Sequence, residues 1–223
     1  MKAIILAGGR GKRLRPITDY VPKPLVPLNN IPIIEWQIKY LKKFGVDEII
    51  ICTGYKTEMI QHFLSMKNSL GIKIKFSVEK TPLGTGGAIK QAGKLIKDKS
   101  FFVINGDTIT NIDLKKLLKK LYAIAAIELR TKFGIMETKD DKVTMFREKK
   151  EVSDVWMNAG IYHLENKVLK DLPKKGDIEK TVFPDYAKKG ILNTIKFKNT
   201  NWYSIDSFKD IEECSLEIHK IIK

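Results

Sequence analysis

The chain contains 223 residues, of which 43% are hydrophobic, and its formal net charge is +15. This length suffices for one sizeable core, so we predict a single domain over residues 1–223. No apolar run approaches the roughly 20 residues of a membrane span, so we expect no membrane partner. Cys52 and Cys214 lack metal-site spacing, which favours reduced thiols in a cytoplasmic protein. Because the positive charge is spread as lysine and no nucleic-acid motif is present, we expect anionic substrates and no specific nucleic acid.

The first predicted element is a short apolar strand, residues 3–7, which breaks at Gly8-Gly9 into a basic loop. Three of the five arginines of the chain lie in this loop: Arg10, Arg13 and Arg15. Glycine lets backbone amides approach phosphate oxygens closely, and guanidinium groups bind those oxygens in pairs. The strand and its loop therefore predict a polyphosphate-binding site.

Two common phosphate motifs do not fit this loop. A P-loop needs glycine where the chain has Leu6, and serine or threonine where it has Arg13. A dinucleotide fingerprint starting at Gly9 needs glycine where the chain has Leu14. A basic surface turn remains as the alternative to a phosphate site of another kind.

Strands and helices then alternate along the chain. Apolar spacing predicts helices over residues 33–44 and 57–67 and strands over residues 48–53 and 72–78. In the strand that ends at Val78, every second residue is apolar, which predicts one buried face. Such alternation is typical of βαβ units, in which helices cover both faces of a mostly parallel sheet.

A glycine-rich segment, residues 82–88, leads into a predicted helix that ends near Lys97. Because the first amides of a helix lack partners within it, we expect these amides to hold the base and ribose of a nucleotide. An ordinary glycine-rich helix start is the alternative. Glu79 favours guanine, since a carboxylate accepts hydrogen bonds from the two adjacent N–H donors of that base, but a solvent-exposed Glu79 stays equally open.

The strand at residues 101–104 ends in Asn105-Gly106-Asp107. Ligands of open α/β sheets bind beyond the carboxyl ends of the strands. Mg²⁺ is usually held by one or two carboxylates together with substrate phosphates, so Asp107 is a candidate magnesium ligand. The alternative is an Asx turn that caps the next helix.

The second half of the chain alternates less regularly. Its predicted elements are a helix near 113–121, a strand at 123–129, a hairpin turned by Asp140-Asp141, a strand at 155–164, a helix at 177–189, a strand at 191–197 and a final helix.

The opening of the chain resembles that of the sugar-1-phosphate nucleotidylyltransferases, also called nucleotide-sugar pyrophosphorylases. The residues that carry this resemblance are Gly8, Gly9, Gly11, Arg13, Leu14, Pro16, Thr18 and Pro22-Lys23-Pro24. Segments 71–79, 82–89 and 105–108 look most like the mannose-1-phosphate and heptose-1-phosphate guanylyltransferases. The resemblance implies a Rossmann-like three-layer αβα sandwich with a mixed, mostly parallel sheet, the nucleotide-diphospho-sugar transferase (GT-A-like) fold. Its nucleotide-binding half would cover about 1–110, and its sugar-binding half about 111–223.

The resemblance also implies a reaction and its residues. An Mg²⁺-dependent enzyme of this kind transfers a nucleotidyl group from a nucleoside triphosphate to a sugar 1-phosphate, with GTP and mannose 1-phosphate favoured here. The implied catalytic residues are Arg13, Lys23, Asp107 and Lys149. The implied nucleotide-binding residues are Leu6, Ala7, Gly8, Gly9, Gly11, Lys12, Arg13, Glu79, Pro82, Gly84 and Thr85. The implied sugar-binding residues are Gly106, Gly134, Glu148 and Asn158.

One segment departs from the family pattern. The family places a second metal carboxylate where this chain has Ser204, whereas Asp206 follows two residues later on the same face of an extended segment. Three outcomes stay open: Asp206 replaces that ligand, Asp107 binds the metal alone with more water, or the enzyme is weakened. Other acceptors, a thymidylyl- or uridylyltransferase, and a regulatory paralogue without turnover are the alternative functions. The sequence leaves homo-oligomerisation open.

Overall fold

The computed structural model describes residues 1–131, 133–147 and 151–222. Its main sheet has seven strands in the order β12-β8-β11-β6-β1-β4-β5. The strands are β1 (Lys2–Ala7), β4 (Glu48–Thr53), β5 (Lys73–Val78), β6 (Ser100–Asn105), β8 (Ala123–Arg130), β11 (Glu151–Glu165) and β12 (Asn193–Phe197). β1 is parallel to both of its neighbours, β4 and β6, whereas β11 runs antiparallel to β6 and β8. The predicted mixed, mostly parallel sheet is confirmed.

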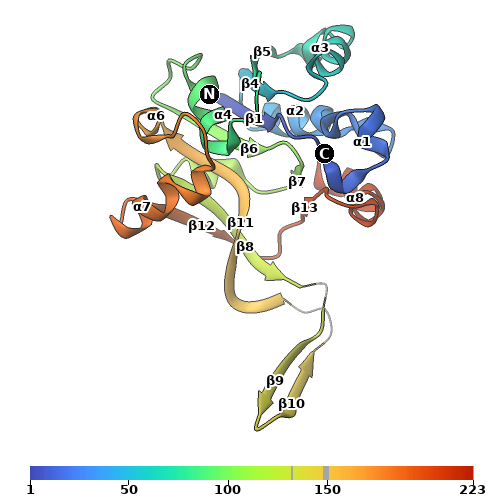
Figure 1. Cartoon of the computed structure of the whole chain (residues 1–223), viewed down its shortest axis with the longest axis vertical. Coiled ribbons are helices and arrows are strands. Elements are labelled where there is room, and N and C mark those ends of the chain that lie inside the picture. Colours follow the sequence, from blue (N-terminus) through green and yellow to red (C-terminus); the bar gives the residue numbers. More distant parts are fainter. Residues whose placement is uncertain (132, 148–150, 223) are drawn as a thin grey trace.

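Helices cover both faces of this sheet (Figure 1). Ile5 of β1 belongs to a core with residues of α2 (Ile33–Lys43), α3 (Thr57–Met66), α5 (Leu114–Leu117) and α8 (Phe208–Ile221). Ile4 faces the opposite core, with residues of α4 (Gly84–Gly93), α6 (Val168–Asp171) and α7 (Val182–Lys188). Successive side chains of a strand point to opposite faces of the sheet. Both isoleucines are fully buried because helices cover both faces. The predicted three-layer αβα sandwich is therefore confirmed.

Short elements connect these layers. They are η1 (Lys12–Leu14), α1 (Ile17–Tyr20), η2 (Lys23–Leu25), β2 (Pro27–Leu28), β3 (Ile31–Pro32), η3 (Asn68–Gly71), β7 (Thr108–Thr110), η4 (Ile178–Lys180) and β13 (Trp202–Ser204). β13 pairs antiparallel with β7, so Ser204 lies opposite Thr108. This pairing brings a late segment of the chain to the end of β6.

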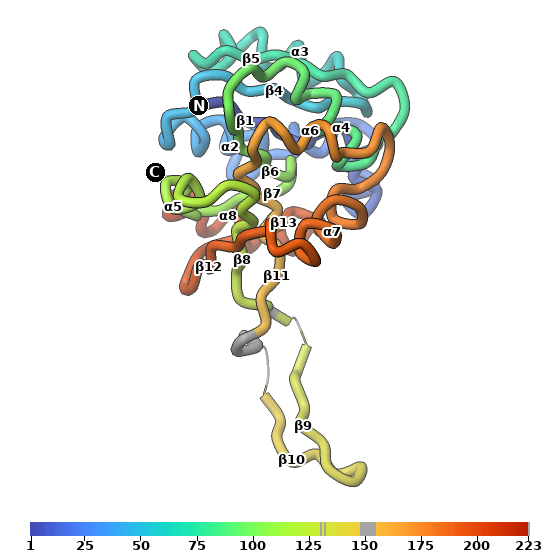
Figure 2. The backbone as a smooth tube through the Cα atoms, turned by 90° about the vertical axis from the view of Figure 1, so that its left-hand side faces the viewer, coloured from blue at the N-terminus to red at the C-terminus, as the bar shows by residue number. Residues whose placement is uncertain are grey.

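A separate two-stranded hairpin extends from the body of the molecule (Figures 1 and 2). It consists of β9 (Ile135–Lys139) and β10 (Lys142–Arg147). Asp140 and Asp141 form its turn with φ of 47° and 60°, a conformation that short acidic side chains tolerate. The predicted hairpin is confirmed, and its tip lies away from the main sheet.

Several predicted boundaries were wrong. The helix expected near 113–121 contains only Leu114–Leu117, the helix expected to reach Lys97 ends at Gly93, and β12 begins at Asn193 rather than at residue 191. The helix expected over 177–189 is divided into η4 and α7, since Pro184 lacks an amide hydrogen and fits only the first turn of a helix. Val78 is 46% exposed rather than buried, because it ends the edge strand β5, which has only one neighbour.

In the part of the chain that the structure describes, no helix combines the length and apolarity needed to cross a membrane.

Candidate functional site

The candidate site lies where β1 and β6 end side by side. Leu6 of β1 pairs with Asn105 of β6, so the loop that follows Ala7 meets the turn at Gly106-Asp107. The Gly106 amide donates to the Leu6 carbonyl at 2.9 Å, and a Cβ at residue 106 would collide with that carbonyl oxygen. Glycine is therefore required at position 106, because only glycine lets this turn come so close to the end of β1.

Two connected cavities open along this edge. The smaller, about 250 Å³, is lined by Arg13, Lys23, Asp107 and Asp206 among others. The larger, about 920 Å³, extends from Asp107 to Glu79 and reaches Pro82, Gly84 and Thr85. Residues common to both cavities are Leu6, Gly9, Gly11, Lys12, Gly106 and Asp107. Most residues expected to bind the nucleotide thus lie along one cleft, and Arg13 and Asp107 line the same cavity.

Lys23 joins the two carboxylates of the smaller cavity. Its Nζ donates to Asp107 Oδ2 and to Asp206 Oδ1, each at 2.7 Å, and its side chain is only 13% exposed. The Ile205 amide donates to the Asp107 carbonyl at 3.0 Å and thereby holds the segment before Asp206 against the turn. The structure therefore places Asp206, two residues after the family position, beside Asp107.

The surroundings of Asp206 favour its ionised form. Burial opposes ionisation, but hydrogen bonds from Lys23 and Ser204 and the charge of Arg13 hold the pKa of Asp206 below its usual value. The Ser204 hydroxyl donates to Asp206 Oδ2 at 2.9 Å, and Arg13 lies 2.8 Å from Oδ1. Ser204 thus supports the carboxylate that stands beside it.

The loop after β1, which lines the cleft, leaves backbone donors unpaired. Among the described residues, the amides of Gly9, Arg10 and Gly11 have no hydrogen-bond acceptor. Gly11 has φ of 63°, a left-handed conformation that glycine adopts without strain. The Arg13 side chain is 75% exposed, and the Arg10 guanidinium lies 5.4 Å from the ring centre of Tyr55. Sequence reasoning missed Tyr55, which follows β4 with no motif around it.

Glu79 closes the far end of the larger cavity. Its Oε2 accepts a hydrogen bond from the Leu83 amide at 3.0 Å. The carboxylate packs against Gly8, where a Cβ would lie only 2.5 Å from Glu79 Oε1. Burial raises the pKa of Glu79 above its usual value, and the Leu83 bond offsets part of that rise. Glu79 is thus half-buried in the cleft, not a freely solvated surface residue.

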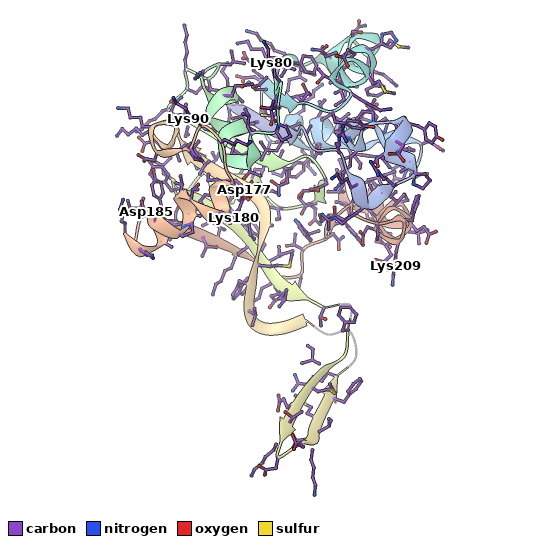
Figure 3. The ribbon with its side chains drawn as sticks, viewed as in Figure 1. Lys80, Lys90, Asp177, Lys180, Asp185 and Lys209 are labelled. Atoms are coloured by element: carbon purple, nitrogen blue, oxygen red, sulfur yellow. The ribbon has the colours of Figure 1, made fainter. Side chains whose placement is uncertain are left out.

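Three amides in the first turn of α4, those of Thr85, Gly86 and Gly87, are paired within the protein, contrary to our expectation. Gly86 and Gly87 donate to the Gly176 carbonyl at 2.9 and 3.2 Å, and the Thr85 amide faces Asp177 Oδ1 at 3.4 Å. A Cβ on Gly86 would lie 2.9 Å from the Gly176 oxygen. These glycines therefore allow a loop to pack on α4, and Figure 3 shows Asp177 beside the start of that helix.

A hydrogen-bonded chain that sequence reasoning missed runs from Thr85 into the second half. The Thr85 hydroxyl donates to Glu179 Oε2 at 2.5 Å, Tyr162 donates to Glu179 Oε1 at 2.9 Å, and Asn158 Nδ2 donates to the Tyr162 hydroxyl at 2.9 Å. Asn158 lines neither cavity, but this chain connects it to Thr85, which does. Glu179 carries no sequence signal, since it is one of many acidic residues in a lysine-rich stretch.

Of the three residues expected on or beside the hairpin, the structure describes only Gly134, which does not join the cleft. Gly134 immediately precedes β9 and lines neither cavity. Glu148 and Lys149 lie outside the described residues. The sugar-binding role implied for Gly134 and Glu148 and the catalytic role implied for Lys149 stay predictions.

The donor chemistry of the smaller cavity fits a magnesium ion. Mg²⁺ prefers oxygen ligands and typically takes one or two carboxylates plus phosphate oxygens. Asp107 and Asp206 supply two carboxylates that already face one cation, the Lys23 ammonium. The described residues contain no group of three or more potential ligands of the His, Cys, Asp or Glu type, so an all-protein metal cage is absent from that part of the chain.

Comparisons with known proteins show what this chain is similar to. A family model described as Nucleotidyl transferase matches residues 2–221. The D-glycero-alpha-D-manno-heptose 1-phosphate guanylyltransferase of Campylobacter jejuni is 40% identical over 195 residues, which cover 84% of this chain and 87% of that protein. The mannose-1-phosphate guanylyltransferase catalytic subunit beta of Danio rerio is 35% identical over 225 residues, which cover 94% of this chain but 62% of that longer protein.

Two solved structures have a similar fold. The crystal structure of HddC from Yersinia pseudotuberculosis superposes with a TM-score of 0.79 at 31% identity, covering 97% of this chain and 98% of that one. A second structure of HddC, complexed with GMP-PN, superposes with a TM-score of 0.77 at 29% identity and the same coverage.

Proposed function

The chain belongs to the nucleotidyl transferase family, and from that premise we propose that it transfers a guanylyl group from GTP to a sugar 1-phosphate and releases pyrophosphate. The observation that carries this proposal is the Lys23 ammonium held between Asp107 and Asp206 at one end of a cleft that ends at Glu79. Cations and carboxylates at one end suit a triphosphate with its metal. A half-buried carboxylate at the other end suits a base with paired N–H donors.

The chemistry asks the protein to position and neutralise charge. The attacking phosphate oxygen of the sugar is already anionic, so no general base is required. Arg13 and the free amides of the loop would bind the outer phosphates of the triphosphate. Lys23 would offset repulsion between the two anionic substrates, and Asp107 with Asp206 would hold Mg²⁺. When bound, Mg²⁺ supplies positive charge to the phosphate that is transferred and to the departing pyrophosphate.

Glu79 supports guanine as the base. Guanine offers adjacent N1–H and N2–H donors, whereas thymine and uracil offer one N3–H donor. The Leu83 amide already fixes one oxygen of Glu79, which orients the carboxylate in the cavity. The names of both relatives and the guanine nucleotide analogue in the HddC complex point the same way.

We place the acceptor among manno-configured sugar 1-phosphates. Mannose 1-phosphate is our first choice, and D-glycero-α-D-manno-heptose 1-phosphate is the second, since each names the substrate of a relative that matches most of this chain. The two sugars differ beyond C5, which is where a specificity assay must discriminate.

The test is a pyrophosphate-release panel of four nucleoside triphosphates against mannose, heptose and glucose 1-phosphates, with Mg²⁺ and with EDTA. We expect release with GTP and a manno-configured acceptor, and none with EDTA. Preference for dTTP or UTP with glucose 1-phosphate would overturn the base and sugar assignments. Binding of a nucleotide sugar without release under any condition would indicate a regulatory protein in place of an enzyme.

A further inference from the structure

Gln37 is a buried carboxamide beneath the turn that carries Asp107. It lies on α2, its side chain is 1% exposed, and its Nε2 donates to the carbonyl oxygens of Asn105 at 2.8 Å and Thr108 at 2.9 Å. Because both partners can only accept hydrogen bonds, the nitrogen of the carboxamide must face them. One NH₂ group therefore joins the last residue of β6 to the first residue of β7.

These two carbonyls flank Gly106 and Asp107. Two neighbouring segments of the same chain also hold this turn. The Gly106 amide donates to the Leu6 carbonyl, and the Ile205 amide donates to the Asp107 carbonyl. Gln37 differs from these contacts because it fixes both ends of the turn at once. The direction of the Asp107 side chain follows from the backbone between those ends.

Gln37 itself does not reach the cleft. It lines neither cavity, and its Oε1 is buried with no hydrogen-bond partner among the described residues. A buried acceptor without a partner is unfavourable, so the two bonds donated by Nε2 must outweigh that cost. The carboxamide is thus oriented by the turn alone.

We propose that Gln37 is a positioning residue that sets the Asp107 carboxylate relative to Lys23 and Asp206. The inference rests on the proposed guanylyl transfer, because it assigns Gln37 a role in that reaction without contact to substrate. The carboxylate of Asp107 already has one oxygen 2.7 Å from Lys23, and a shift of the turn changes that geometry directly. Misplacement of a catalytic group by about 1 Å can lower a rate by about a hundredfold.

The test compares Gln37→Met with Tyr40→Phe. Methionine is close to glutamine in size and removes both donated bonds. Tyr40 lies on the same helix, is 3% exposed and donates to the Ile112 carbonyl at 2.7 Å, so Tyr40→Phe removes a buried bond of the same kind away from the turn. We expect both variants to melt at lower temperature, but only Gln37→Met to lose kcat, by about tenfold or more, and to need more Mg²⁺ for half-maximal rate, with KM for the sugar 1-phosphate unchanged.

Amide hydrogen exchange of the free protein gives a readout without turnover. Exchange at Gly106 and Ile205, whose hydrogen-bonded amides hold the turn, should accelerate in Gln37→Met and stay at the wild-type rate in Tyr40→Phe. A kcat loss equal to that of Tyr40→Phe, or unchanged exchange at the turn, would overturn the inference. An inactive wild-type protein would overturn the proposed function and the inference together. If the wild-type protein is active, the two variants test the inference alone. If Gln37→Met does not fold, Gln37→Asn, which is too short to reach both carbonyls, takes its place with the same expectations.

Discussion

Two glycine-rich segments line the same cleft, and they use glycine for different purposes. In the loop after β1, a Cβ on Gly9 would meet nothing within 4 Å, and the neighbouring amides have no acceptor among the described residues. At the start of α4, a Cβ on Gly86 or Gly87 would press on the backbone of the 174–176 loop, and both amides are paired with Gly176. The first segment is open for a ligand, whereas Gly86 and Gly87 of the second are closed off by packing.

This difference shows what glycine content does and does not indicate. Glycine permits close approach, but the approaching partner is a phosphate in our proposal for the first segment and a piece of the same chain in the second. The partner of the second segment lies about ninety residues away in sequence, from Gly86 to Gly176. The composition of the segment alone therefore cannot tell a binding loop from a packing surface.

The largest effect on the open segment is expected from Arg13→Ala. This change removes a guanidinium that is 75% exposed toward the cleft, and we expect kcat/KM for GTP to fall roughly a hundredfold. Arg15→Ala is the matched control, because Arg15 forms an exposed ion pair with Asp19 at 3.0 Å and lines neither cavity. Steady-state pyrophosphate release measures both. Equal losses in the two variants would show that the loop contributes only general charge.

A pair of glycine variants tests the comparison directly. Gly86→Ala places a methyl group 2.9 Å from the Gly176 oxygen, so we expect a stability loss of about 1–3 kcal/mol. For a chain of this size, that loss lowers Tm by about 2–4 °C per kcal/mol. Gly9→Ala meets no protein atom, so we expect Tm to stay near the wild-type value while KM for GTP rises.

Thermal melts and initial rates on both glycine variants provide the readout. The comparison fails if Gly9→Ala is the less stable variant, or if Gly86→Ala melts like the wild-type protein.

A smaller effect is expected from Glu79→Gln, which tests the base end of the cleft. Glutamine presents one acceptor and one donor group in place of two acceptors, so the preference for GTP over dTTP should fall by about tenfold, the equivalent of about 1.4 kcal/mol. Competition between the two nucleotides in one reaction measures this preference. An unchanged preference would remove Glu79 from base recognition.

The raised pKa of Glu79 predicts a pH dependence with a defined sign. Burial raises this pKa in the folded protein, so the ionised form is disfavoured by folding and the contribution of Glu79 to stability declines as pH rises from about 4.5 through the folded value. Glu79→Gln should therefore gain Tm relative to wild type over that interval. The wild-type preference for GTP should instead strengthen with rising pH, since the acceptor is the carboxylate.

Local signals in the sequence predict the first half of the fold well. β1, β4 and β6 are short apolar runs bounded by glycine or polar residues, and such runs are typical of buried strands in a central sheet. The strand ends then place the basic loop and Asp107 at one edge, because parallel strands share a direction. The family pattern and the physical pattern coincide in this region.

The second half depends on contacts that no local pattern specifies. The pairing of β13 with β7 brings Asp206 to Lys23, and a shift in that register would move the carboxylate away. The contact of Gly176 with α4 and the bond from Tyr162 to Glu179 likewise join residues whose spacing carries no period. Sequence reasoning therefore identified Asp206 as a candidate but left its role open.

The most direct test of the cleft is Asp107→Asn assayed for Mg²⁺-dependent pyrophosphate release from GTP and mannose 1-phosphate. Asparagine keeps the size of the side chain but removes the charge that faces Lys23, so circular dichroism should report an intact fold while turnover falls by about a hundredfold or more. Release at the wild-type rate by this folded variant would contradict the assignment of nucleotidyl transfer to the cavity that Arg13 and Asp107 line.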